Sequence, residues 1–395
     1  MASFLKSINL LNFTRTTTSA SYTSTADREP IWLYTATDYD GVNDVKFSAV
    51  MRATSGDASA MTLSTIGGTD VTGAEVTTTS TANVNVLSGD ILANLTNATE
   101  YRARWKRASG AGTSSFDGAS VLISQTDPTA TMTIIELGED NNVPSTSYSA
   151  PTDYGIFQYD SAMFDGTVAI YLEADLHNNG AGDTTYGALY DITGTAQVTS
   201  SEVSHTGDTT TTRKRSGAIT LTNGREYRPD IKGTSTSDDV PAVKLIIKQT
   251  GTITKTASYV PILNTVSSGT ETSYTAQNRL FTFNNTDWSA TTTKNFYYEA
   301  TLKVSANTGY SQLYNVTDSA QLSELTTTST TYARVRSTAL SMPVDTANVL
   351  GNYRKIDTSG TVTHGRTFLI VELEEATAST SIKDLIGGGF IPFAR

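Results

Sequence analysis

The sequence predicts an all-β protein of three tandem antiparallel β-sandwich repeats, jelly-roll-like, followed by a C-terminal tail. Three observations predict this fold class: a repeat of constant period, period-two alternation of apolar residues, and a composition rich in strand and turn formers. Tyr22, Tyr148 and Tyr274 stand in the matching contexts SYTSTA, SYSAPT and SYTAQN, at intervals of 126 residues (148−22 and 274−148). The repeat therefore has the size of a common protein domain.

A second marker has the same period. Tyr101, Tyr227 and Tyr353, each followed by Arg, are again 126 residues apart (227−101 and 353−227). Each repeat is long enough to bury its own core, so we expect independent modules joined like beads on a string. The predicted bounds of the three repeats and the tail are 1–129, 130–255, 256–378 and 379–395.

The apolar N-terminus, MASFLKSINLLNF, is the first element. It has some features of a weak signal peptide. However, Ile8 recurs one period later as Ile134 and two periods later as Val260 (134−8 and 260−134 are both 126). We therefore interpret it as the first strand of the first repeat. Without an export signal, the protein is expected to be assembled in the host cytoplasm and released by lysis.

The third strand of each repeat has the clearest pattern. In the second repeat the inward positions are Val168, Ile170, Leu172, Ala174 and Leu176. More polar residues alternate with them, as expected of a strand with one face in the core and one face toward solvent. Tyr171 and, in the third repeat, Tyr297 belong to the outward face.

The remaining strands follow at regular spacing. Leu189-Tyr190 and Leu313-Tyr314 mark the fourth strand, a strand with Glu at 75, 202 and 324 follows it, and the Tyr-Arg motif marks the seventh. No segment has a sustained helical period. Eight short strands per repeat favour a jelly roll, with an immunoglobulin-like sandwich as the alternative because strand order is not readable from sequence.

Composition excludes several functional classes. The chain has 28 basic and 39 acidic residues and a net charge of −11, which argues against a nucleic-acid partner. It contains no cysteine, so neither a disulfide framework nor a thiolate site is available. No apolar run approaches the roughly 20 residues that a membrane-spanning helix requires, so no membrane insertion is expected.

No catalytic arrangement is repeated along the chain. The three histidines, His177, His205 and His364, fall at unrelated offsets within their repeats. No Ser-His-Asp or histidine-cluster pattern recurs. We predict that the protein is not an enzyme and needs no cofactor.

One acidic loop is a candidate calcium site. Asp38, Asp40 and Asp44 flank Gly41 with alternating oxygen ligands, as calcium-binding loops do. The alternative is an Asx-rich turn between the second and third strands, because the downstream bidentate Glu of an EF-hand loop is missing.

Three aromatic residues are candidates for binding a glycan. Trp288 lies in a polar stretch, NNTDWSATTTKN, and is expected at the surface. Tyr171 and Tyr297 are candidates because they lie on the outward face of the third strand. The alternative is that both tyrosines belong to an ordinary solvated sheet face.

The tail from residue 379 to 395 belongs to no complete repeat, and we interpret it as an orphan first strand. Its apolar residues, predicted to mediate assembly, are Ile382, Leu385, Ile386, Phe390, Ile391 and Phe393. An apolar strand without a sheet is an unpaired edge, which can add to a neighbouring subunit or fold back onto its own third repeat.

The repeated strands GALYDIT (from Gly187) and SQLYNVT (from Ser311), the paired SEV and SEL strands and the EYR strand resemble tandem β-sandwich modules of tailed-bacteriophage virion proteins. Capsid decorations, head fibres and tail-fibre segments contain such modules. The resemblance implies a structural or adhesive virion component, oligomeric and located in the virion. It implies as partners other virion or surface-assembly subunits, further copies of this chain and host glycans.

Two functions therefore remain open. The first is a structural virion or surface protein that attaches through its terminal segments and adheres to host glycans. The second is a carbohydrate-binding tandem-module protein or adhesin that is not part of a virion and acts at an extracellular surface.

Overall fold

The computed structural model of the chain describes residues 3–11, 14–23, 29–140, 142–143, 145–207, 209–263, 266–345 and 347–375. In these residues all long elements are β-strands that pair antiparallel. The helical elements there are four three-residue 3-10 turns: η1 (Ala36–Asp38), η2 (Leu92–Asn94), η3 (Ser161–Met163) and η4 (Asn285–Asp287). None of these turns has the length and apolar character needed to cross a membrane.

The strands form six sheets, and each pair of sheets comes from one continuous segment, which we call a module. Module one spans residues 3–126. Its first sheet contains β1 (Ser3–Leu11), β9 (Ser114–Thr126), β4 (Val42–Ala53) and β7 (Val84–Leu87), with β2 (Arg15–Thr17) paired to β9. Its second sheet contains β3 (Trp32–Tyr34), β8 (Thr99–Ser109), β5 (Ala58–Thr65) and β6 (Val76–Thr78).

Module two spans residues 130–250 and repeats this arrangement. Its first sheet contains β11 (Asp153–Tyr154), β10 (Ala130–Asp140), β19 (Asp239–Thr250), β13 (Thr167–His177) and β17 (Thr212–Arg215). Its second sheet contains β12 (Phe157–Gln158), β18 (Glu226–Gly233), β14 (Thr184–Asp191), β15 (Ala196–Gln197) and β16 (Val203–Thr206).

Module three spans residues 255–374. Its first sheet contains β20 (Lys255–Leu263), β28 (Val362–Glu374), β23 (Thr293–Val304) and β26 (Ala333–Arg336), with β21 (Ser267–Gly269) paired to β28. Its second sheet contains β22 (Thr275–Phe283), β27 (Asn348–Ile356), β24 (Gly309–Asn315) and β25 (Ala320–Thr327).

The strand order identifies the type of sandwich. When the eight main strands of a module are numbered in chain order, one sheet has the order 1-8-3-6 and the other the order 2-7-4-5, in all three modules. This pairing of the first strand with the last, and of the second with the seventh, is that of a jelly roll. The predicted all-β sandwich class is therefore confirmed, and the immunoglobulin-like alternative is wrong.

The predicted inward positions form the cores. In β13, Ile170, Leu172, Ala174 and Leu176 are all buried, as the period-two pattern predicted, while Val168 is half-buried and packs against the same cluster. The N-terminal segment is a strand, since β1 pairs along its length with β9. The interpretation of Ile8 as a first-strand residue is therefore confirmed.

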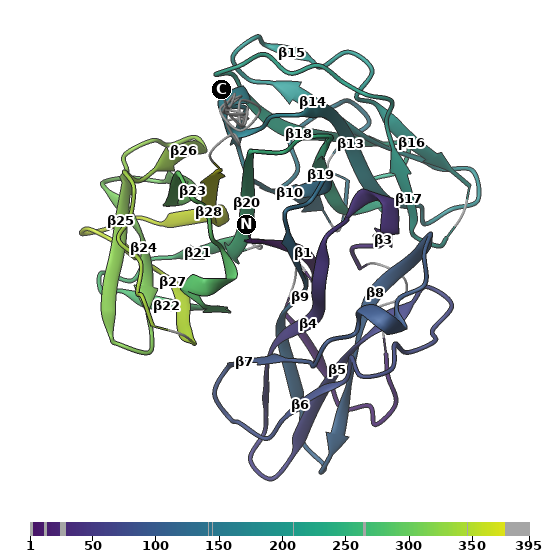
Figure 1. The fold of residues 1–395 in the computed structure, drawn as a ribbon, viewed down its shortest axis with the longest axis vertical. Coiled ribbons are helices and arrows are strands. Elements are labelled where there is room, and N and C mark those ends of the chain that lie inside the picture. Colours follow the sequence, from purple (N-terminus) through teal and green to yellow (C-terminus); the bar gives the residue numbers. More distant parts are fainter. Residues whose placement is uncertain are drawn as a thin grey trace, which may run out of the picture.

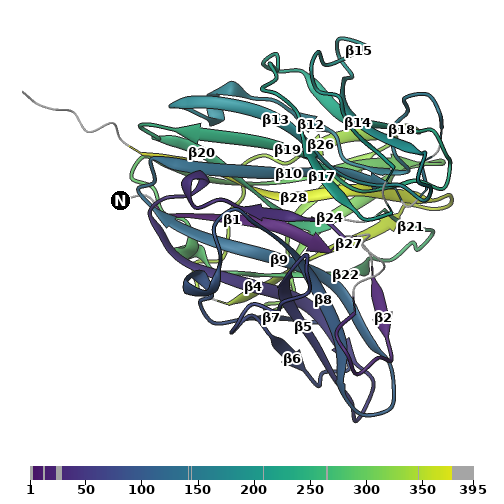
Figure 2. The same ribbon diagram turned by 90° about the vertical axis from the view of Figure 1, so that its right-hand side faces the viewer.

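The modules do not lie like beads on a string; they surround their own first strands. β1, β10 and β20 contact one another, and Figures 1 and 2 show them at the centre of the molecule with the three modules around them. The buried clusters also continue from one module into the next. Met132 and Ile246 of module two belong to the core cluster of module one, and Tyr259 and Phe368 of module three to that of module two.

The contacts between modules run in one direction and close into a ring. η1 of module one contacts β10 of module two, η3 of module two contacts β20 of module three, and η4 of module three contacts β1 of module one. Each is therefore a head-to-tail contact between equivalent parts. Three such contacts that return to the starting module make a closed, approximately three-fold arrangement within one chain.

Candidate functional site

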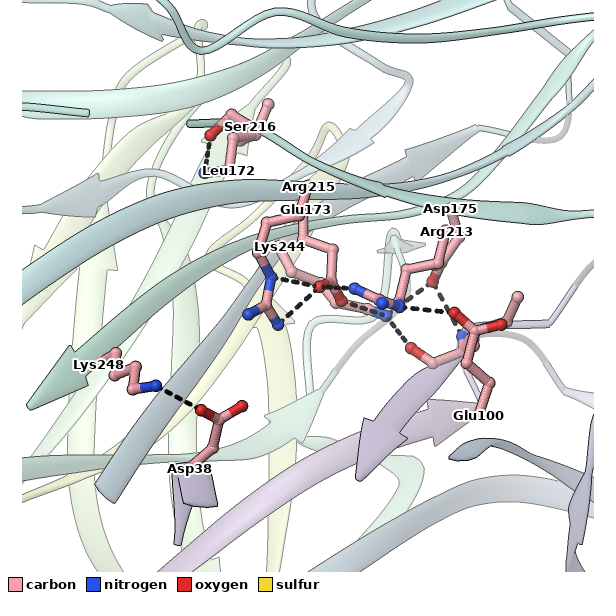
Figure 3. A network of polar contacts seen from close by, with 11 residues as sticks. Asp38, Glu100, Leu172, Glu173, Asp175, Arg213, Arg215, Ser216, Lys244 and Lys248 are labelled. Atoms are coloured by element: carbon pink, nitrogen blue, oxygen red, sulfur yellow. Dashed lines mark hydrogen bonds and ion pairs between the residues drawn. The ribbon is translucent and has the colours of Figure 1, made fainter. Parts of the chain in front are cut away.

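The junctions between modules contain buried charged side chains, and Figure 3 shows those at the junction of modules one and two. This junction is built on β13 and β19, where Glu173 lies opposite Lys244. The Lys244 Nζ lies 2.7 Å from Asp175 Oδ2 and 3.8 Å from Glu173 Oε1. It also donates a hydrogen bond of 2.5 Å to the carbonyl of Ile31, while the Ile31 N–H donates to Asp175 Oδ2 at 2.9 Å.

Through these contacts the backbone N–H and carbonyl groups of Ile31 in module one are hydrogen-bonded to a charged pair of module two. Both charges are buried, and an ion pair in that position stabilises only when its remaining polar valences are satisfied. The Ile31 backbone supplies the missing donor and acceptor. Module one therefore supplies one hydrogen-bond donor and one acceptor to an ion pair that module two holds.

The basic cluster that the sequence contains at β17 belongs to the same junction. Arg213 Nη1 lies 2.6 Å from Glu173 Oε2, and Arg215 Nη2 lies 2.9 Å from the same oxygen. The Arg213 Nε also reaches Glu100 of module one at 2.9 Å. These arginines are paired with carboxylates within the ring.

The pKa values of the Glu173 and Asp175 carboxyls are shifted in opposite directions. Burial would raise the pKa of Glu173, but Lys244, Arg213 and Arg215 together hold it below its ordinary value. Burial raises the pKa of Asp175 to about 6, because Lys244 only partly offsets the loss of water and Glu173 repels its charge. The outer edge of the junction has a separate, more exposed ion pair, Lys248 with Asp38 at 2.6 Å (Figure 3).

The junction of modules two and three is built around one arginine of module three. Arg366 lies 3.5 Å from Glu136, 3.4 Å from Glu139 and 3.4 Å from Asp153, all of module two. Burial raises the pKa of all three carboxyls, most strongly that of Glu139, because a single guanidinium cannot compensate three buried charges. The surplus carboxyl therefore keeps its proton to a higher pH than an ordinary glutamate.

The junction of modules three and one is more apolar. Trp288 follows η4, is 0% exposed, and its indole N–H donates to the Leu5 carbonyl of β1 at 3.2 Å. Its ring stacks on Phe283 at 5.6 Å between centroids. Arg279 completes this junction by donating to the Ser120 hydroxyl at 2.9 Å.

A lysine occupies the centre, where the three first strands meet. Lys6 of β1 is 2% exposed, and its Nζ donates to Thr133 Oγ1 and Thr256 Oγ1, both at 2.9 Å, and to the Ala257 carbonyl at 2.7 Å. All three acceptors are neutral and come from modules two and three. Burial without a compensating carboxylate lowers the pKa of Lys6 to about 7.

The aromatic residues predicted to bind a glycan lie at these junctions. Trp288 is fully buried, so the prediction that it lies at the surface is wrong; the polar residues around it belong to a turn at a module interface. Tyr171 packs against the core cluster of module one, and Tyr297 against that of module two. In modules two and three the outward face of the third strand is thus partly covered by a neighbouring module.

The three carboxylates of the candidate calcium loop have separate partners. Asp38 pairs with Lys248, Asp44 lies 3.0 Å from Lys46, and Asp40 accepts hydrogen bonds from the backbone N–H groups at 129 and 130. Asp40 thereby fixes the link between modules one and two. No group of three or more acidic or histidine side chains in the described residues is arranged to hold a metal ion.

The apolar tail residues predicted to mediate assembly, 382–393, lie outside the described residues. The other terminal segment is used inside the ring. Phe4 and Leu5 of β1 belong to the buried cluster of module three, so β1 is not a free attachment strand.

A repeated surface cluster was not predicted as a unit, although its tyrosines and glutamates were noted as repeated residues. The Tyr148 hydroxyl donates to Glu202 Oε2 at 2.6 Å, and Lys232 Nζ lies 4.3 Å from the centre of the Tyr148 ring. The equivalent clusters are Tyr22, Glu75 and Lys106, and Tyr274, Glu324 and Lys355. In each cluster the tyrosine holds the segment before the second strand against the second sheet of its module. The tyrosine that recurs every 126 residues therefore has a structural role.

No family model and no curated protein matches the chain. Among solved structures it is similar to one described as the triple jelly roll fold and turret assembly in an archaeal virus, with a TM-score of 0.22 and 9% identity over 93% of this chain and 92% of that chain. It is also similar to a structure from Sulfolobus Turreted Icosahedral Virus, with a TM-score of 0.21 and 11% identity over 94% of this chain and 90% of that chain.

A third similarity is to the VP2 subviral particle of infectious bursal disease virus, with a TM-score of 0.20 and 8% identity over 94% of this chain and 81% of that chain. All three structures come from viruses.

Proposed function

We propose that this protein is a non-enzymatic structural component of a virus particle, of the decoration type, in which one chain forms a three-fold-like body. The observation that carries the proposal is the closed ring of three jelly rolls. Head-to-tail contacts either close or propagate into a filament, and here they close after three modules. A closed body supports a compact decoration better than an extended fibre.

The buried polar junctions support a rigid body. Lys244 with Asp175, Arg366 with its carboxylates, and Trp288 with β1 hold the three modules by different chemistry, and each side chain is buried. Buried hydrogen-bonded charges fix a single geometry, because a misaligned arrangement leaves a charge unpaired. Such a body suits a position of three-fold symmetry on a shell, with other virion subunits as its partners.

Cryo-electron microscopy of particles released from cells that produce the protein would test this proposal. We expect density for the three-module ring at fixed positions on the particle surface, absent from particles made without the protein. Recovery of the protein only as a free monomer, with no difference between the two kinds of particle, would contradict the proposal. That result would favour a carbohydrate-binding protein or adhesin that acts outside a virion.

A further inference from the structure

A polar cavity of about 430 Å³ opens at the outer end of module two. It lies between the turn that carries β15 and the loop that leads into β18; Figure 1 shows β15 at the top of the molecule, far from the central strands. Its volume is within the range of about 300–1,000 Å³ found for small-molecule sites. None of the residues that line it takes part in the module junctions described for Lys244, Arg366 or Trp288.

The cavity has an apolar base and a polar rim. Ile219 and Tyr227, which are among its lining residues, are buried at 7% and 1% exposure. The Tyr227 hydroxyl is already used, since it accepts a hydrogen bond from the Thr222 N–H at 2.7 Å. Gln197 and Thr220 are exposed lining residues, and the Gln197 side chain also hydrogen-bonds to Tyr148.

The two charged residues of the lining neutralise each other. Arg225 Nη1 lies 2.7 Å from Asp191 Oδ2, and the other Asp191 oxygen accepts from the Gly194 N–H at 2.6 Å. The cavity therefore presents a hydrogen-bonded ion pair without a net charge. The remaining polar groups of the wall are amides and hydroxyls, which can both donate and accept hydrogen bonds.

One wall of the cavity is formed by a segment that is longer in module two than in the other two modules. Asp191 and Glu202 bound the segment that forms it, and they are 11 residues apart (202−191). The matching residues of module three, Asn315 and Glu324, are 9 apart (324−315), so module two has two more residues there. An extra loop segment beside a repeated scaffold is a common place for a binding site.

We propose that this cavity binds a neutral saccharide unit of a cell-surface glycan. A sugar hydroxyl both donates and accepts, which matches Gln197, Thr199 and Thr220, and the C–H face of a sugar ring matches the apolar base at Ile219. The paired charges of Asp191 and Arg225 favour a neutral ligand over an acidic one. This binding is additional to the structural role, and it places adhesion in module two alone.

The test uses the full chain coupled to beads at high density, with fluorescent neutral hexoses, N-acetylhexosamines and their disaccharides as probes and sialylated sugars for comparison. We expect binding of at least one neutral probe. Gln197→Ala should weaken it about three- to tenfold, as expected for one lost hydrogen bond. Ala218→Trp, which fills the cavity, should abolish it.

The matched control is Gln321→Ala in module three. Gln321 lies opposite Tyr314 as Gln197 lies opposite Tyr190, but it is not part of the cavity lining. This variant should bind like the wild type.

No binding of any neutral probe by the wild type, binding of sialylated probes only, or unchanged binding by Ala218→Trp would each overturn the proposal. None of these results bears on whether the ring is found on a virus particle, so the two proposals can fail separately.

Discussion

Replacement of Lys6 by Met is expected to stabilise the protein near neutral pH, although it removes three hydrogen bonds. Burial lowers the pKa of Lys6 from 10.5 to about 7. At ~1.4 kcal/mol for each pKa unit, this corresponds to at most about 5 kcal/mol of stability lost below pH 7, where the amine is charged in both states. Met keeps the apolar stem and removes that cost.

The acceptors left behind have other partners. Thr133 Oγ1 donates to the Ala257 carbonyl at 2.8 Å, and Thr256 Oγ1 donates to Gln249 Oε1 at 2.7 Å. Loss of the ammonium donor therefore does not leave these hydroxyls alone in the interior. The loss of its hydrogen bonds offsets part of the gain, so we expect a net stabilisation of about 1–3 kcal/mol at pH 6.

The pH dependence separates this explanation from simple repacking. As pH rises from 7 to 10.5, the folded protein releases the Lys6 proton before the unfolded chain does, so the wild type becomes more stable. The Lys6→Met variant has no such titrating amine, so its stability does not rise in this way. The difference in stability between the variant and the wild type should therefore shrink by about 3 kcal/mol between pH 6 and pH 9.5. Chemical denaturation midpoints at several pH values would measure it.

Lys255→Met is the matched control. Lys255 pairs with Glu374 at 3.1 Å, and the two side chains are 40% and 38% exposed, so this ion pair is expected to contribute little. We expect no pH-dependent gain from the control. An advantage of Lys6→Met that is the same at pH 6 and pH 9.5, or a loss of stability at every pH, would refute the reasoning.

Three further substitutions test the junctions and the surface clusters. Trp288→Ala should cost about 3–5 kcal/mol in the free energy of unfolding, because it empties a fully buried site between modules three and one; a loss under 1 kcal/mol in urea denaturation would contradict the packing described. Glu139→Gln should flatten the pH dependence of thermal unfolding. The raised pKa makes the wild type lose stability as pH rises above 4.5, and an unchanged profile would count against that assignment. Tyr148→Phe removes one half-exposed hydrogen bond to Glu202 and should lower stability by about 1 kcal/mol or less, measured by the same denaturation; a larger loss would show a wider role for the cluster.

The period-two pattern predicted the inward face of each third strand but not the fate of the other face. Leu172 and Ala174 lie in the core as expected. Glu173 and Asp175 of the same strand are buried as well, because a second module covers them. A polar face that contacts water and a polar face that contacts another module have the same alternation, so sequence could not separate them. Lys244, a charge inside the apolar run 240–247 of β19, was the available signal.

The second sequence marker, the Tyr-Arg motif, lies on the seventh strand in all three modules, β8, β18 and β27, but its register in the third module differs from that in the second. Tyr227 lies opposite Asp191 in its sheet, and the residue opposite the matching Asn315 in module three is Leu350 rather than Tyr353. The true interval there is 123 residues (350−227), because connecting segments differ in length. Identical residues at a constant spacing therefore do not occupy equivalent register positions in all three seventh strands.

The covalent links between the modules change what the centre of the ring can contain. Lys6, Thr133 and Ser258 occupy the same register position, each opposite a residue of the last strand of its module. A trimer of identical chains would place three copies of one side chain there, so a single central cation would be impossible. In one chain, one strand supplies the ammonium and another supplies an acceptor. The ring also persists at any dilution, because its closing contact is intramolecular.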